Sequence, residues 1–262
     1  MEWDQGPAPA FAALLESAPL AEYAGKPDRF RLEWGPIYYR GRTDGSARVL
    51  LIGQDPAADE DVARRILVGD AGQRVQGLLA KLGLTRSYVM VNASLYSATG
   101  QFDAELRTFM DRPAVKAWRN QLLDALLTPA IEAVVALGQA ARHVTDTWPG
   151  AAPVKHAGRL FQLVHPTARP DSTVMNDWNS HLAALAAKVA PDPDGVVDLT
   201  PYAGTKFAAS ALAPIPPRDL AFGAPALMGR GISAARFKAG QAFPDGMKDK
   251  PAILWIAIEP QG

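Results

Sequence analysis

Short, strongly apolar runs that alternate with helix-length segments constrain the fold of this chain most. Four runs, rich in valine, leucine and alanine, have the length and composition of strands that are buried on both faces. We expect strands at 49–52, 88–93, 133–138 and 160–166, and helices at 8–23, 74–81, 115–127, 139–145 and 176–189. Strands alternating with helices predict an α/β fold, a three-layer α/β/α sandwich around a mostly parallel four-stranded sheet.

Proline and glycine divide the chain into two parts. Residues 1–189 form the predicted α/β domain, with a helical and aromatic lead-in before the first central strand. From 190 to 262 frequent prolines and glycines break up any periodicity, although apolar residues persist and the segment 251–258 resembles one last strand. We therefore expect an irregular extension that packs on the same domain, rather than a linker to a second one.

Composition excludes several kinds of chemistry. The chain has no cysteine, so disulfides, cysteine nucleophiles, thiolate zinc sites and iron–sulfur clusters are ruled out. The four histidines lack the close spacing of metal ligands, and we expect neither a metal nor a cofactor. No run has membrane-spanning length and no signal peptide is visible, which favours a cytoplasmic protein, expected to be a monomer that does not bind membranes.

Lysine plus arginine and aspartate plus glutamate both number 27, so the net charge is zero. Proteins that bind nucleic acid through bulk charge usually carry a basic excess. Any contact with DNA must therefore come from a local basic face.

A polar residue stands at the carboxyl end of three of the predicted strands: Asp55, Asn92 and His165. Each has an ordinary structural explanation, since Asp55 could cap a helix, Asn92 could form a turn, and His165 could be a structural histidine. In parallel sheets, however, the carboxyl ends of the strands converge on one cleft, where ligands bind. Their shared position therefore favours a functional site.

The sequences around these residues resemble the signature of the uracil-DNA glycosylase superfamily. The resemblance rests on Gly53-Gln54-Asp55-Pro56, on the asparagine that ends Val89-Met90-Val91-Asn92, and on Val164-His165-Pro166-Thr167. The segment Leu67-Val68-Gly69-Asp70-Ala71-Gly72-Gln73 resembles the iron–sulfur branch of that superfamily. Because the cluster cysteines are absent, the chain is similar to a divergent branch.

The resemblance implies that a uracil nucleotide is flipped out of DNA and that its N-glycosidic bond is hydrolysed. Asp55 would orient water and stabilise the cationic sugar. Asn92 would read the uracil edge, and His165 would hydrogen-bond uracil O2 as negative charge collects there. Gln54 would contribute a backbone amide to the pocket.

The resemblance also implies contacts with single- or double-stranded DNA. The turn that contains Thr167 would enter the minor groove, with Arg169 at the position of the wedge residue that fills the space left by the flipped base. Arg65 is a candidate phosphate contact, with simple solvation as the alternative.

Two positions depart from the family pattern. Leu67 stands where the iron–sulfur branch stacks an aromatic side chain on the base, and Ala57 stands where the best-known branch excludes thymine with a tyrosine. We therefore expect a monofunctional uracil-DNA glycosylase and keep two alternatives: a lesion- or abasic-site-binding module with weak catalysis, and a glycosylase for hypoxanthine or mismatched thymine.

Overall fold

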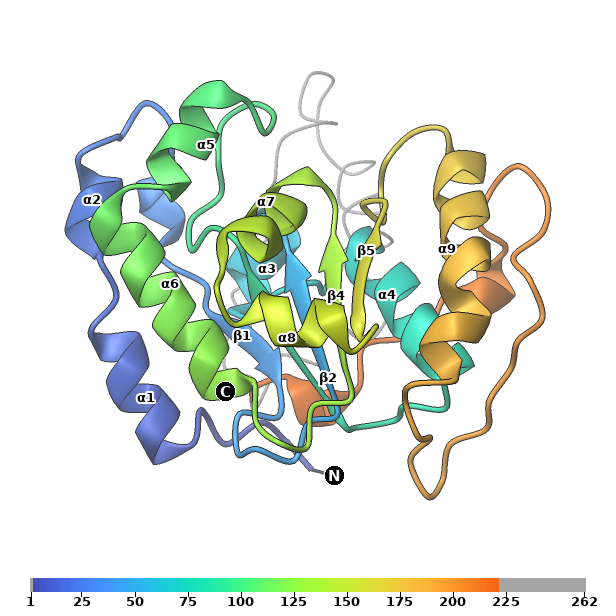
Figure 1. Cartoon of the computed structure of the whole chain (residues 1–262). Helices are drawn as coiled ribbons and strands as arrows, with labels where there is room; N and C mark the ends of the chain where they lie inside the picture. The colour runs from blue at the N-terminus through green and yellow to red at the C-terminus, as the bar shows by residue number, and fades with distance from the viewer. Residues whose placement is uncertain (1, 222–262) are drawn as a thin grey trace, which may run out of the picture.

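The computed structural model describes residues 2–221, which form a central sheet between two layers of helices (Figure 1). Over these residues the sheet has five strands in the order β1-β3-β2-β4-β5. The strands are β1 (Tyr39–Gly41), β2 (Val49–Gly53), β3 (Tyr88–Asn92), β4 (Ala133–Leu137) and β5 (Leu160–Leu163). Strands β2 to β5 run parallel, and β1 is antiparallel to β3. The predicted three-layer α/β fold is confirmed.

The sheet has one strand more than the four expected. The additional strand, β1, comes from the aromatic segment before β2 and pairs Tyr39 with Val91 at the outer edge of β3. Three residues are too few for a periodic pattern, and a short edge strand is recognised only through its partner.

Only the helices with a long apolar periodicity agree with the predicted ones. The α-helices of the described residues are α1 (Pro9–Glu16), α2 (Leu20–Ala24), α3 (Ala58–Ala63), α4 (Asp70–Lys81), α5 (Ala104–Met110), α6 (Pro113–Leu126), α7 (Gln139–Thr147), α8 (Ala151–His156) and α9 (Asp171–Ala186). One helix was expected at 8–23, with Pro19 limiting its extent; the structure has two helices there, because Pro19 separates α1 from α2. The helices α3, α5 and α8 were not predicted, since six or seven residues carry little periodic signal. None of the helices in the described part of the chain could cross a membrane.

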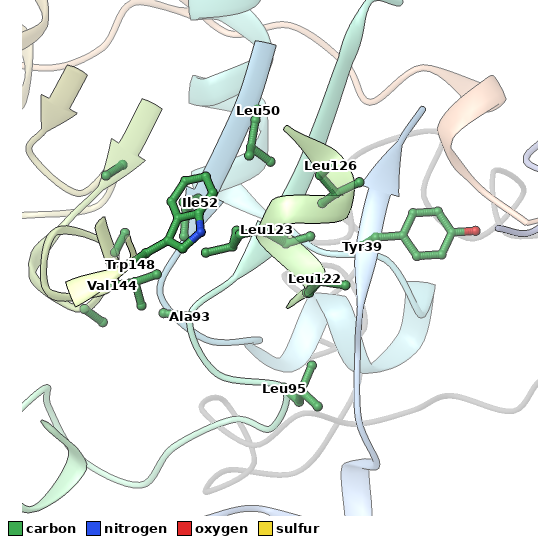
Figure 2. Close-up of a cluster of buried hydrophobic side chains, with 14 of the residues drawn as sticks. Tyr39, Leu50, Ile52, Ala93, Leu95, Leu122, Leu123, Leu126, Val144 and Trp148 are labelled. Carbon is green, nitrogen blue, oxygen red and sulfur yellow. The ribbon is translucent and has the colours of Figure 1, made fainter. Parts of the chain in front are cut away.

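Alternate residues of each central strand face opposite helical layers. In β2, Leu50 and Ile52 belong to the core under α1, α6, α7 and α8, whereas Val49 and Leu51 belong to the core under α4 and α9. Figure 2 shows part of the first core, where Leu50 and Ile52 lie near the apolar side chains of α6 and Trp148. Burial on both faces explains why these strands are continuous apolar runs.

Residues 190–221 run along the molecule without long helices or strands, and two aspartates anchor them. Asp219 is fully buried, where it pairs with Arg40 (3.4 Å) and accepts a hydrogen bond from the Tyr88 hydroxyl (2.8 Å). Burial alone would raise the pKa of Asp192, but hydrogen bonds from Ser87 and the neighbouring backbone lower it to about 2. The strand expected at 251–258 lies outside the described residues.

Candidate active site

The carboxyl ends of the four parallel strands lie at one edge of the sheet. In spatial order β3, β2, β4 and β5, the residues that end or follow these strands are Asn92, Asp55, Gly138 and His165. Chain connections also diverge here, because β2 leads to α4 on one face while β3 leads to α5 and α6 on the other (Figure 1). Such a switch point is where open α/β sheets bind ligands.

Asn92 is buried, and its carboxamide lies against Gly53. The two residues are partners in the register of β2 and β3, and a Cβ at position 53 would stand only 2.3 Å from the Asn92 Oδ1. That oxygen is buried without any hydrogen-bond partner in the described structure. Because buried polar atoms are nearly always paired, an unpaired amide oxygen at this edge is suited to receive a donor from a ligand.

Asp55 follows β2 and is held by the loop after β3. Its Oδ2 accepts the backbone N–H of Ala98 at 3.0 Å. Burial raises the pKa of the Asp55 carboxyl, and the hydrogen bonds from Ala98 and Gln54 only partly offset this. The carboxylate is therefore a stronger proton acceptor than an exposed aspartate, which suits a group that activates water.

His165 follows β5 with its ring orientation set by the next turn. Its Nδ1 accepts the backbone N–H of Thr167 (3.3 Å) and lies 3.1 Å from the Thr167 hydroxyl. Burial lowers the pKa of the imidazole, which favours the neutral ring. With Nδ1 as acceptor, the proton of the neutral ring resides on Nε2, so His165 offers an N–H donor on its far side.

Gly138 is part of this edge although the sequence did not single it out. Its φ is +89°, and a Cβ there would lie 2.9 Å from the His165 Cβ. A side chain would thus be strained and would also displace the imidazole. A glycine directly after a buried strand was the available signal, and it reads equally well as an ordinary helix start.

Leu67, which the resemblance aligns with the stacking position, lies near Gly53. Its Cδ1 is 3.7 Å from the position that a Cβ on Gly53 would take, and the side chain is buried. The backbone next to Leu67 is held by Glu60, a buried acid that was not predicted as a site residue. Its carboxylate accepts the backbone N–H groups of Ala57 and Val68 at 3.0 Å each. An acidic residue three positions after the residue that caps a helix is the pattern that could have identified it.

Gln54 and Ala57, the other two predicted substrate-binding residues, lie in the segment between β2 and α3. Gln54 joins the β2 and β3 loops, because its carbonyl accepts the N–H of Ser94 at 3.0 Å. Ala57 is exposed at the start of α3.

The predicted DNA contacts differ in how free their side chains are. Thr167 and Arg169 are exposed on the loop after His165, where Arg169 pairs with Asp171 at 2.7 Å. By contrast, Arg65 is largely buried, forms an ion pair with Asp4 (2.6 Å) and covers the Tyr39 ring. Within residues 2–221, no group of three or more histidine, cysteine or acidic side chains is arranged to hold a metal ion.

The family model of the uracil DNA glycosylase superfamily matches residues 40–184, more than half of the chain. The chain belongs to this superfamily. A search of curated proteins found no significant match. Membership supports a DNA glycosylase in general terms, with DNA as the substrate, and the matched range contains the four strand ends described above.

Proposed function

We propose that the protein is a monofunctional glycosylase that hydrolyses the N-glycosidic bond of uracil in DNA, releasing uracil and leaving an abasic site. The observation that carries this proposal is the Asn92 carboxamide, whose buried oxygen has no hydrogen-bond partner among residues 2–221. Uracil presents an N3–H donor beside the O4 acceptor, and an amide can pair with both at once.

The reaction follows from the other two strand ends. When the C1′–N1 bond breaks, its electron pair goes to the base and the negative charge spreads to O2, where the Nε2–H of His165 can donate. The sugar carbon becomes cationic, and the Asp55 carboxylate stabilises it. Water then adds to C1′ and gives its proton to Asp55, whose pKa is raised by burial. No lysine stands in the segments around Asp55, Asn92 and His165 to form a Schiff base, so the proposed nucleophile is water.

DNA would approach the loop that follows His165. Thr167 and Arg169 are exposed there, and the Arg169 side chain is 74% exposed although it pairs with Asp171. We propose that the protein acts as a monomer, on single- or double-stranded DNA.

Two alternatives remain, each motivated by one residue. Leu67 beside Asn92 offers no aromatic face for stacking, which would suit a module that binds damaged DNA but turns over weakly. The exposed Ala57 leaves the thymine methyl unopposed, which would suit a glycosylase for mismatched thymine or hypoxanthine.

Oligonucleotides with a single uracil, hypoxanthine, T·G mismatch or undamaged thymine, treated with alkali after incubation, distinguish these functions. Excision of uracil over many turnovers supports the proposal, whereas product limited to one equivalent favours the binding module. Faster cleavage at hypoxanthine or at the T·G mismatch favours a glycosylase for that base. Asn92→Ala should lower uracil excision by about 100-fold or more, the loss typical of a single transition-state contact. Asn120→Ala is the matched control, because its amide oxygen lies on α6 and is likewise buried without a partner in the described part of the chain.

A further inference from the structure

The backbone on both sides of His165 is held by side chains from two helices. The N–H of Val164 donates to Asp177 (2.7 Å), and the carbonyl of Val164 accepts the indole N–H of Trp178 (3.0 Å). The carbonyl of Pro166 accepts a hydrogen bond from the Arg74 guanidinium (2.7 Å). Since the imidazole is tied to the adjacent turn through its Nδ1, its position follows this backbone.

Arg74 is itself held in place. Both of its terminal nitrogens contact the Asp171 carboxylate at 3.2 Å, and its side chain is only 11% exposed. Bidentate arginine–carboxylate pairs have a defined geometry, so the donor to Pro166 cannot swing away without breaking both contacts.

Phe207, from the segment 190–221, covers the two side chains that hold the carbonyls around His165. Its ring lies 4.5 Å from the guanidinium carbon of Arg74 and packs edge-on against Trp178, with 5.7 Å between ring centroids. Tyr202, from the same segment, contacts both rings, at 5.3 Å from Phe207 and 5.9 Å from Trp178. The segment thus contacts the side chains that hold the backbone around His165.

We propose that Arg74 and Phe207 are positioning residues, through which the segment 190–221 keeps the His165 imidazole aligned with the flipped base. This rests on the function proposed above, in which His165 donates to the leaving base. A donor to a developing anion must be aligned closely, and a misplacement of about 1 Å can cost about 100-fold in rate. In this proposal the segment 190–221 contributes to catalysis indirectly, by holding the residues that position His165.

The test uses Arg74→Met, which keeps the length of the side chain but removes its donors, and the milder Phe207→Leu. We expect kcat for uracil excision to fall about 10- to 100-fold with little change in KM, because DNA binding is left intact. Phe207→Tyr keeps the ring and should restore the wild-type kcat.

Two-bond ¹H–¹⁵N spectra of the imidazoles give a readout that does not depend on activity. With four histidines in the chain, His165→Gln assigns the relevant signals. In the wild type we expect a neutral ring protonated on Nε2, and in Arg74→Met and Phe207→Leu a mixture of tautomers and a pKa closer to that of free histidine.

Arg48→Met is the matched control. Arg48 also anchors the segment 190–221, through the carbonyls of Ala190 and Pro191 and the Asp192 carboxylate, but it precedes β2 at the opposite edge of the sheet. It should lower the unfolding midpoint while leaving kcat and the His165 signals unchanged. An equal loss of kcat in Arg48→Met, or unchanged His165 signals in Arg74→Met and Phe207→Leu, would overturn the proposal. If the wild type excises no base, the proposed function fails, and the spectra still decide whether these residues position His165.

Discussion

Gly53 and Asn92 face each other across β2 and β3, and the missing side chain of the first makes room for the carboxamide of the second. A Cβ on Gly53 would stand 2.3 Å from the Asn92 Oδ1, well inside van der Waals contact. The glycine that ends the first central strand thus also makes room for a side chain of the candidate site.

Gly53→Ala should displace the Asn92 carboxamide and reduce uracil excision by about 100-fold, the typical cost of a misplacement of about 1 Å. Steady-state kinetics on a uracil-containing oligonucleotide measure this loss. Gly25→Ala is the control, because a Cβ there meets only ordinary contacts at 3.4 Å or more and its φ is helical. Full activity in Gly53→Ala would show that Asn92 does not need this space.

Asp55→Asn should abolish most excision, because an amide can still accept the Ala98 N–H but cannot take a proton from water. In the wild type, kcat/KM should fall on acidification with a midpoint above the ordinary aspartate pKa of about 3.9, since burial raises the pKa of Asp55. A pH–rate profile with no acid limb above that value would contradict the role of this carboxylate.

The same substitution should change stability in a pH-dependent way. A carboxyl whose pKa is higher in the folded than in the unfolded state destabilises the fold when it is ionised. This destabilisation is complete at pH values above the folded-state pKa and absent below the unfolded-state pKa. Asp55→Asn should therefore raise the unfolding temperature at pH 7, and this gain should disappear as the pH falls below the ordinary aspartate range. Thermal unfolding of both proteins across this range checks the sign.

Asp219→Ala should destabilise the protein by about 3 kcal/mol or more, because it leaves the fully buried Arg40 without its carboxylate. Urea unfolding measures the change. Asp194→Ala, in the same segment, removes an ion pair with Arg86 in which both side chains are about half exposed, and it should have a much smaller effect. If both variants lost the same free energy of unfolding, the buried pair of Asp219 and Arg40 would stabilise the protein no more than the exposed pair does.

Arg169→Ala should raise KM for DNA and, if the side chain binds phosphate, reduce the salt dependence of binding by about one counterion. The fold should be unaffected, because the Arg169 side chain is 74% exposed. Binding titrations at several salt concentrations, with Arg86→Ala as an exposed control before β3, measure the effect. The same binding loss in both variants would indicate a general charge effect rather than a contact at the site.

Part of this fold could be predicted from local pattern. The four apolar runs identified β2 to β5, since strands buried on both faces lack polar positions. The short elements could not be found this way: β1 exists through its pairing with β3, and α3, α5 and α8 are too short to carry a periodic pattern. The Arg40–Asp219 pair joins residues 179 positions apart, and no local pattern indicates such a partner.

The candidate site divides in the same manner. Asp55, Asn92 and His165 could be selected because each ends or follows a recognisable strand. Gly138 and Glu60 have only a local pattern that also fits an ordinary helix start, and the contact between Arg74 and Pro166 is one that spacing does not encode.

The sequence by itself determined the chemical groups and the fold class, because residue type and apolar periodicity are local properties. Only the tertiary structure decided what surrounds those groups. The N–H that contacts Asp55 comes from Ala98, 43 positions away, and the arginine behind His165 comes from α4, 92 positions from Pro166. The physical reason is that the order of strands and the packing of helices on the sheet bring distant residues together, and these surroundings set burial, proton affinity and orientation at the site.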